Sequence, residues 1–205
     1  LPHRDLEAWN RVQEGVEARG RLLSLLAGRL PEELTARYRE AVGGLWREIG
    51  DRVESPAVVD SSGSGARSTG RAFALARHTD VDVRVIHLVR DGRAVAWSSA
   101  KRAGSPERPE VRLPGSLRAL RAGAAWTVAN FACEWIRRGL GPDRVLRVRY
   151  EDLVTDPVGE LRAIGAFAGL EMEDLVEKVR ADAGLEVGHN VAGNRLRFRD
   201  EIRIR

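Results

Sequence analysis

The chain has 205 residues and a formal net charge of +4, and arginine carries nearly all of its positive charge because Lys101 and Lys178 are the only lysines. That length is enough for one α/β domain with a hydrophobic core. The lone cysteine, Cys133, excludes disulfides within the chain and cysteine-rich metal sites, and it fits a reducing, cytoplasmic location. No apolar stretch approaches the roughly 20 residues of a membrane span. No aromatic residues interleave with a basic stripe, so the composition predicts no nucleic-acid partner.

Residues 1–50 are expected to form a helical N-terminal part, in two amphipathic stretches divided near Pro31. The apolar positions of these stretches predict core residues: Trp9, Val12, Val16, Tyr38, Val42, Leu45, Trp46 and Ile49. A short strand is expected at 57–59, followed by a Ser- and Gly-rich turn over 60–65. A helix is expected next, over 66–77.

The stretch from Val85 to Ser99 predicts a strand, a turn and a helix. Val85–Val89 is apolar and mostly β-branched, which indicates a strand buried on both faces of a parallel sheet. The helical pattern begins at Arg93 and places Ser98 about one turn inside the helix. Unpaired backbone N–H groups at such a helix start attract anions, and Arg90 would meet the same anion from the strand end. An ordinary surface ion pair between Arg90 and Asp91 is the alternative.

The rest of the chain continues the alternation of strands and helices. A loop over 104–115 precedes a long helix over 117–138, and a strand over 145–150 precedes a helix over 158–168 that Asp156 caps. This order predicts an α/β fold with a parallel, doubly wound sheet and flanking helices, which binds ligands at the carboxyl ends of its strands. Residues 1–205 form a single domain in this prediction, with a nucleotide-binding core and C-terminal loop over 57–199.

Four motifs occur together in one order: Val58-Val59-Asp60-Ser61-Ser62, the stretch from Val85 to Ser99, Arg149-Tyr150-Glu151-Asp152-Leu153, and His189-Asn190-Val191-Ala192-Gly193-Asn194. In these motifs the chain resembles bacterial sulfotransferases, over most of its length from about Val58 to Arg199. The resemblance implies a fold similar to that of P-loop kinases. It also implies 3′-phosphoadenosine 5′-phosphosulfate (PAPS) as co-substrate and no metal.

The resemblance assigns roles to residues of this sequence. Arg90 and Ser98 look like the pair that binds the 3′-phosphate of the nucleotide. The turn at Gly193 and Asn194, with Arg197 after it, resembles the C-terminal loop that closes over the same nucleotide. The alternation of arginine with apolar residues over 195–199 also fits an exposed strand. Tyr150-Glu151-Asp152-Leu153 is interpreted as structural, tying the end of the strand to a loop.

The family transfers a sulfuryl group from PAPS to an acceptor hydroxyl or amine, which needs in-line positioning, charge stabilisation and a base. Relatives commonly have lysine where this chain has Gly63, which lowers the activity expected here. Asp60 is the nearest candidate base, and Ser62 is a candidate hydrogen-bond donor beside it. A structural role for Asp60, capping the next helix, is the alternative.

The family also places a phosphate-binding loop after its first strand, and no such unit precedes Leu6. The expectation is therefore an incomplete domain that lacks its first β-loop-α unit, exposes an apolar edge and is marginally stable and inactive alone. The acceptor can be a small molecule, a carbohydrate or a lipid, and the sequence specifies neither the acceptor nor the oligomeric state.

Two other functions fit parts of the sequence. The segment from Gly65 to Gly70 resembles a degenerate phosphate-binding loop of a nucleotide kinase or NTPase, with Arg71 and Ala72 in place of its lysine and hydroxyl residue. The arginine-rich tail over 195–205 fits a non-catalytic basic binding module. Among the histidines, His87 is expected to be a satisfied structural residue, whereas His189 lies close to the Gly193 loop.

Overall fold

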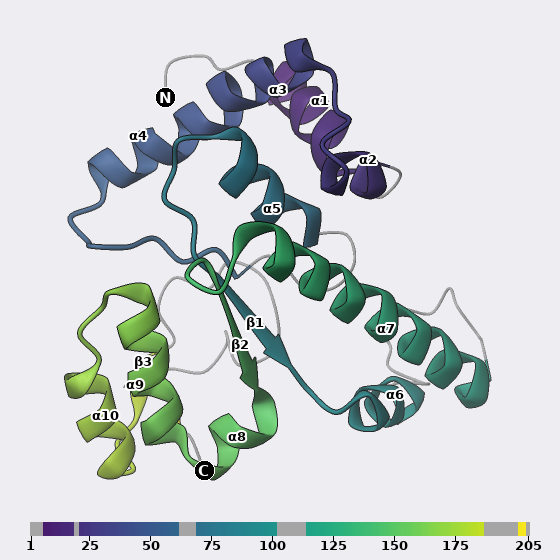
Figure 1. Ribbon diagram of the computed structural model, residues 1–205. Coiled ribbons are helices and arrows are strands. Elements are labelled where there is room, and N and C mark those ends of the chain that lie inside the picture. Colours follow the sequence, from purple (N-terminus) through teal and green to yellow (C-terminus); the bar gives the residue numbers. More distant parts are fainter. Residues whose placement is uncertain (1–5, 19–20, 62–68, 102–113, 187–200, 204–205) are drawn as a thin grey trace.

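The computed structural model describes residues 6–18, 21–61, 69–101, 114–186 and 201–203 (Figure 1). Between Val85 and Arg149 its strands and helices follow the order that the sequence predicts. In chain order they are α1 (Leu6–Glu17), α2 (Leu22–Leu26), α3 (Glu32–Tyr38), the π-helical turn η2 (Arg39–Gly43), α4 (Gly44–Arg52), α5 (Thr69–His78), β1 (Val85–Val89), α6 (Gly92–Lys101), α7 (Gly115–Leu140), β2 (Val145–Arg149), α8 (Tyr150–Thr155), α9 (Pro157–Ala168), α10 (Glu173–Arg180), β3 (Leu185–Glu186) and β4 (Glu201–Ile202).

The N-terminal helices pack against α5 and the end of α7, and this contact forms the main core. Its buried residues come from α1, α2, α3, η2, α5, α7 and β2: Val16, Leu25, Tyr38, Val42, Phe73, Ala74, Leu75, Ile136 and Val145. Trp9, Val12 and Trp46 pack against that cluster. Most of the core residues predicted over 1–50 are thereby confirmed, because the amphipathic period of each helix aims one apolar face inward.

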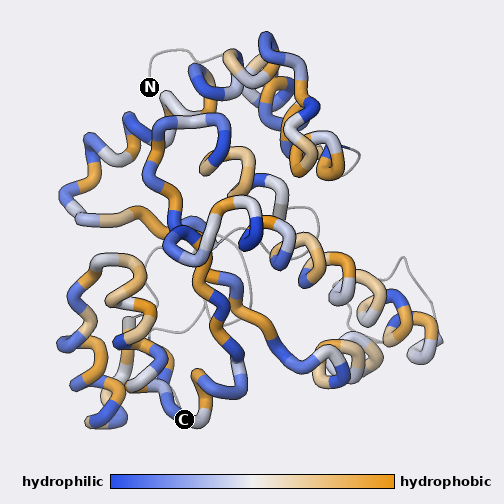
Figure 2. The backbone as a smooth tube through the Cα atoms, viewed as in Figure 1, coloured by the Kyte–Doolittle hydropathy of each residue, from blue (hydrophilic) through white to orange (hydrophobic). Residues whose placement is uncertain are grey.

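β1 and β2 lie side by side as a parallel pair, in register from Val85 with Val145 to Val89 with Arg149. The two strands are the expected ones within one residue. Figure 2 shows hydrophobic residues along β1 giving way to hydrophilic ones in the turn between β1 and α6. Gly141, with a φ of +88°, ends α7 in a backbone conformation that favours glycine and leads the chain into β2.

Two predictions about the sheet are wrong. Residues 57–59 form no strand, since the described chain places no hydrogen-bonded neighbour beside them and Val58 and Val59 are exposed. β1 is not buried on both faces either, because Ile86 is 44 % and Leu88 52 % exposed. Within the described residues β1 pairs with β2 alone, which leaves its other edge and one face open. The α/β class is confirmed, and the doubly wound sheet stays a prediction.

The C-terminal third of the described chain consists of short helices beside β2. Asp156 begins α9 as predicted, where its carboxylate accepts a hydrogen bond from the Gly159 amide at 2.9 Å. The sequence analysis did not predict α10, which packs against α9 (Figure 1). β3 and β4 form a short antiparallel pair.

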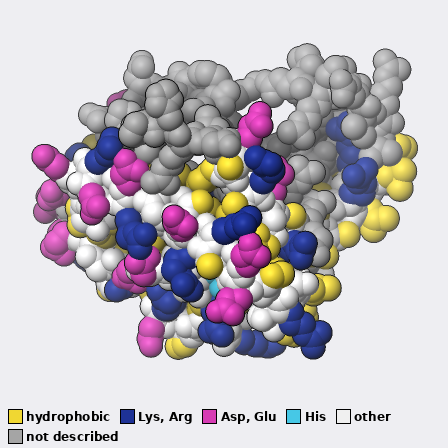
Figure 3. Space-filling model, turned by 90° about the horizontal axis from the view of Figure 1, so that it is seen from above, with side chains coloured by type: hydrophobic (Ala, Val, Ile, Leu, Met, Phe, Trp, Pro, Cys, Tyr) yellow, Lys and Arg dark blue, Asp and Glu magenta, His cyan; other side chains and the backbone are white. Residues whose placement is uncertain are grey.

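The surface gives two further observations. On the face seen in Figure 3, cationic and anionic side chains are interspersed over the described residues rather than gathered by sign. The arginine-rich tail over 195–205, on which the hypothesis of a basic binding module rests, lies outside the described residues except for 201–203. In the described part of the chain, every helix is too short or too polar to cross a bilayer.

Candidate functional site

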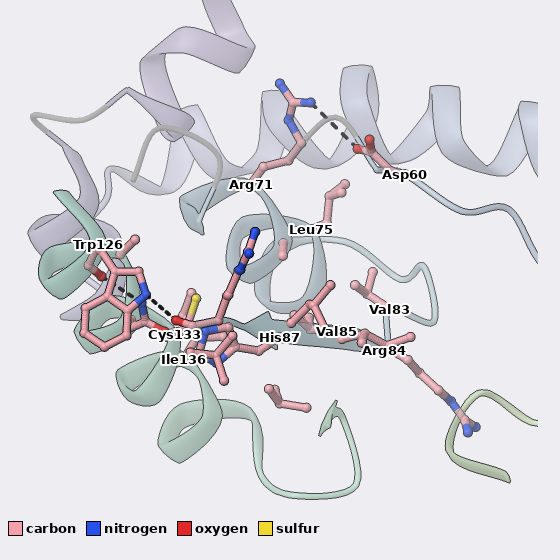
Figure 4. Close-up of a pocket in the computed structure, with 18 of the residues that line it drawn as sticks. Asp60, Arg71, Leu75, Val83, Arg84, Val85, His87, Trp126, Cys133 and Ile136 are labelled. Carbon is pink, nitrogen blue, oxygen red and sulfur yellow. Dashed lines mark hydrogen bonds and ion pairs between the residues drawn. The ribbon is translucent and has the colours of Figure 1, made fainter. Parts of the chain in front are cut away.

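A cavity of about 910 Å³ runs along β1 (Figure 4). Consecutive residues from Val81 to Val89 line it, which means that the cavity follows the open edge of the strand rather than one of its faces. Its walls are mostly apolar, and its polar lining includes His87 on β1, Arg90 directly after β1, Arg71 on α5, Asn130 on α7 and Asp60 in the segment between α4 and α5. The structure thus brings two predicted site residues, Asp60 and Arg90, to one cavity.

Arg90 follows β1 directly and exposes its side chain. Its guanidinium lies over the ring of Tyr150, with the central carbon 4.7 Å from the ring centroid. Asp91 pairs instead with Arg93, at 2.7 Å between Oδ2 and Nη2. The alternative of a surface ion pair between Arg90 and Asp91 is therefore wrong. Among the described residues no carboxylate forms an ion pair with Arg90, so its charge is available to an anion.

Two side chains hold the turn that carries Arg90. The Trp126 indole Nε1 donates to the Arg90 carbonyl at 2.9 Å, and the Glu151 carboxylate accepts from the Asp91 amide at 2.8 Å. Gly92 lets the indole lie close, since a Cβ there would stand 3.2 Å from the Trp126 ring. The interpretation of Glu151 as a structural tie agrees with this contact. The tie runs to the turn between β1 and α6.

The start of α6 differs from the expected anion site. The Asp91 carboxylate accepts from the Arg93 amide at 2.8 Å, so Asp91 caps the helix with its own charge. Glu151 occupies the Asp91 amide in the same way. These donors are already satisfied by carboxylates, which corrects the prediction that unpaired backbone N–H groups here attract an anion. The binding capacity of this turn therefore rests on the Arg90 side chain.

Asp60 faces Arg71 across the cavity mouth, with 3.7 Å between Oδ2 and Nη1 (Figure 4). Arg71 also donates from Nε to Glu17 at 2.9 Å, and the buried hydroxyl of Tyr38 donates to the same carboxylate at 2.7 Å. Burial, reinforced by the Glu17 charge, raises the pKa of Tyr38, which keeps it a hydrogen-bond donor. Asp60, the predicted base, thus lies beside an arginine that residues of α1 and α3 hold in place.

His87 lines the same cavity and is satisfied, as predicted. Its Nε2 lies 3.0 Å from Asn130 Oδ1, and Asn130 Nδ2 donates to the Trp126 carbonyl at 2.8 Å. Because that amide nitrogen is the donor to Trp126, Asn130 Oδ1 accepts and His87 Nε2 carries the proton. Burial lowers the pKa of His87, and the bond to Asn130 opposes this shift.

The remaining predicted site residues lie elsewhere. Ser98 is half-buried on α6 and does not line the cavity, whereas its neighbour Ser99 does. The other candidates lie outside the described residues: Ser62, Gly193, Asn194 and Arg197, together with Gly63 and His189. Among the side chains that are described, no group of His, Cys, Asp and Glu is arranged to hold a metal ion.

Comparison with known proteins identifies the group to which this arrangement belongs. The model of the sulfotransferase family matches residues 71–174, just over half of the chain, and the match includes Arg90, Trp126 and Tyr150. The chain belongs to the sulfotransferase family. This match also disfavours a degenerate kinase, in which Arg71 would serve phosphates rather than pair with Glu17.

Two human sulfotransferases are similar to the chain. Carbohydrate sulfotransferase 2 of Homo sapiens is 31 % identical over 54 % of this chain and 28 % of its own length. Carbohydrate sulfotransferase 6 of Homo sapiens is 30 % identical over 47 % of this chain and 27 % of its own length. The match thus spans less than a third of either relative. No solved structure matches the chain significantly.

The sequence analysis missed Asn130 and the contact of Trp126 with the turn at Arg90, both from α7, and it gave Tyr150 no role toward Arg90. Trp126 and Asn130 are four residues apart and so share one helix face, a spacing that was available as a signal. No local pattern shows that this face meets β1.

The pKa of Asp91 provides a test of the helix cap. Hydrogen bonding from the Arg93 side chain, and then from its amide, lowers the pKa of Asp91 from 3.8 to about 2. A folded-state pKa below the unfolded value means that the cap stabilises the fold above about pH 4 and loses this effect as pH falls toward 2. Arg93→Ala is expected to raise the pKa of Asp91 part of the way back, as measured by NMR titration of its carboxyl carbon. An unchanged pKa in the variant would contradict the observed pairing.

Proposed function

We propose that this protein transfers a sulfuryl group from PAPS to a hydroxyl or amine of a carbohydrate acceptor. The observation that carries the proposal is the uncommitted guanidinium of Arg90, which lies at the carboxyl end of a parallel strand inside the segment that matches the sulfotransferase family. Ligands of open α/β sheets bind at that edge.

Arg90 binds the 3′-phosphate of the nucleotide in this proposal. A planar guanidinium can donate two parallel hydrogen bonds to one phosphate, which gives both affinity and orientation. Ser98 adds a hydroxyl donor from α6, and Gly193, Asn194 and Arg197 close over the nucleotide from the C-terminal loop. These four contacts are predictions from the sequence alone.

The transfer itself is an in-line displacement at sulfur. The acceptor oxygen or nitrogen forms a bond to sulfur, while the bond from sulfur to the bridging oxygen of the 5′-phosphate breaks. The leaving 3′,5′-diphosphoadenosine keeps that electron pair, and the proton of the acceptor passes to the Asp60 carboxylate. Arg71 stands beside Asp60 and orients it, and Ser62 is the proposed donor nearby.

The carbohydrate acceptor is proposed from the names of the two human relatives. A small-molecule or lipid acceptor is the alternative, and the mostly apolar walls of the cavity leave room for it. The single domain over 1–205, the bacterial type and the cytoplasmic location are further predictions of the same proposal.

Nucleotide selectivity tests the proposal. Calorimetric titration should show tighter binding of 3′,5′-diphosphoadenosine than of adenosine 5′-phosphate, which lacks the 3′-phosphate. Labelled PAPS supplied with oligosaccharides, a phenol and a primary amine then identifies the acceptor class. Equal affinity for the two nucleotides, or tighter binding of ATP with Mg²⁺, would overturn the assignment.

A further inference from the structure

To bind an anion, the guanidinium of Arg90 must be held in place by a contact that does not neutralise its charge. Arginine side chains have many rotamers, and an exposed one loses considerable entropy when a ligand orders it. Most arginines of the described chain whose side chains form ion pairs or hydrogen bonds are held by carboxylates, as Arg93 is by Asp91 and Arg162 by Glu173. Arg90 lies on the ring of Tyr150 instead.

The strand register brings this pair together. Val89 lies opposite Arg149 in the parallel ladder, so the next residue on each strand, Arg90 and Tyr150, leaves the sheet at the same level. The Glu151 carboxylate accepts a hydrogen bond from the Asp91 amide at 2.8 Å and thereby links the segment that follows β1 to the segment that follows β2. From the other side, Trp126 holds the Arg90 carbonyl. The backbone under both side chains is therefore fixed.

We propose that Tyr150 is a positioning residue that holds the Arg90 guanidinium by its face and leaves its N–H edge for an anion. This inference rests on the proposed function, in which that anion is the 3′-phosphate. Stacking on an aromatic ring uses the flat face of the guanidinium, whereas a carboxylate partner binds the edge that a phosphate requires.

Two substitutions of Tyr150 distinguish a role of the aromatic ring from a role of the hydroxyl or of apolar bulk. Tyr150→Phe keeps the ring and removes only the hydroxyl, so it preserves the stacking. Tyr150→Leu keeps an apolar side chain and removes the ring. The side chain of Tyr150 is partly exposed, so neither substitution opens a core cavity.

The experiment measures binding of 3′,5′-diphosphoadenosine and adenosine 5′-phosphate to the wild type and both variants. Tyr150→Leu is expected to weaken the diphosphate about fivefold and to leave the monophosphate unchanged, while Tyr150→Phe keeps the wild-type values. In an Arg90→Gln background, Tyr150→Leu should have no further effect on the diphosphate, because the ring acts through Arg90.

Other outcomes overturn the inference in distinguishable ways. Equal weakening of both nucleotides by Tyr150→Leu would mean a merely structural role, and no change in either would mean that the ring does not position Arg90. If the wild type does not prefer the 3′-phosphorylated nucleotide, the proposed function fails first. If the leucine variant does not fold, the chemical shift of the Arg90 Nε–H proton in the wild-type protein tests the inference instead. The ring current of Tyr150 shifts this proton upfield when the guanidinium is stacked on the ring. The absence of an upfield shift would contradict the stacking.

Discussion

Arg90→Gln is expected to reduce the affinity for 3′,5′-diphosphoadenosine by about 100-fold, because a bidentate, charge-assisted contact contributes about 3 kcal/mol. Glutamine keeps a polar side chain of similar length and removes the charge. Adenosine 5′-phosphate should bind the variant as it binds the wild type, since it lacks the group that Arg90 contacts. Calorimetric titration of both nucleotides measures the difference directly.

Arg93→Gln is the matched control for this experiment. Arg93 lies three residues further along the same turn, its side chain is 93 % exposed, and Asp91 already engages its charge. The control should retain the preference for the 3′-phosphorylated nucleotide. An Arg90→Gln protein that keeps that preference, or an Arg93→Gln protein that loses it, would place the 3′-phosphate elsewhere.

Glu17→Ala is expected to lower the free energy of unfolding by about 3 kcal/mol, because it leaves a buried donor without its charged acceptor. The Glu17 side chain is 8 % exposed, and its carboxylate accepts from Tyr38, Arg71 and Gln13. Tyr38 is fully buried and has no access to water as a substitute partner. Denaturant unfolding followed by circular dichroism gives the change.

Glu33→Ala provides the comparison for Glu17. Glu33 also pairs with an arginine, Arg37, at 2.7 Å, but its side chain is 79 % exposed. Exposed pairs of this kind contribute little, so the loss of stability should stay below about 1 kcal/mol. Similar losses in the two variants would show that the contact of α1, α3 and α5 does not depend on the buried carboxylate.

Local pattern predicted much of this protein. The limits of β1, the helix that follows it and the capped start of α9 were all predicted correctly, because each depends on residues close together in sequence. The four motifs in their order also indicated the sulfotransferase family, which the family match confirms. The strand at 57–59 failed for the opposite reason, since a strand requires a partner that its own residues do not specify.

The sequence by itself thus determined the order of elements from β1 to β2, the family and the cation at the end of β1. Only the tertiary structure decided the partners of that cation: Asp91 pairs with Arg93, whereas Arg90 lies over Tyr150 and is held through its carbonyl by Trp126. The two contacts of Arg90 join residues 36 and 60 positions apart. They depend on the register of two parallel strands and on which face of α7 meets them, and both are set by packing of the whole core rather than by local propensity.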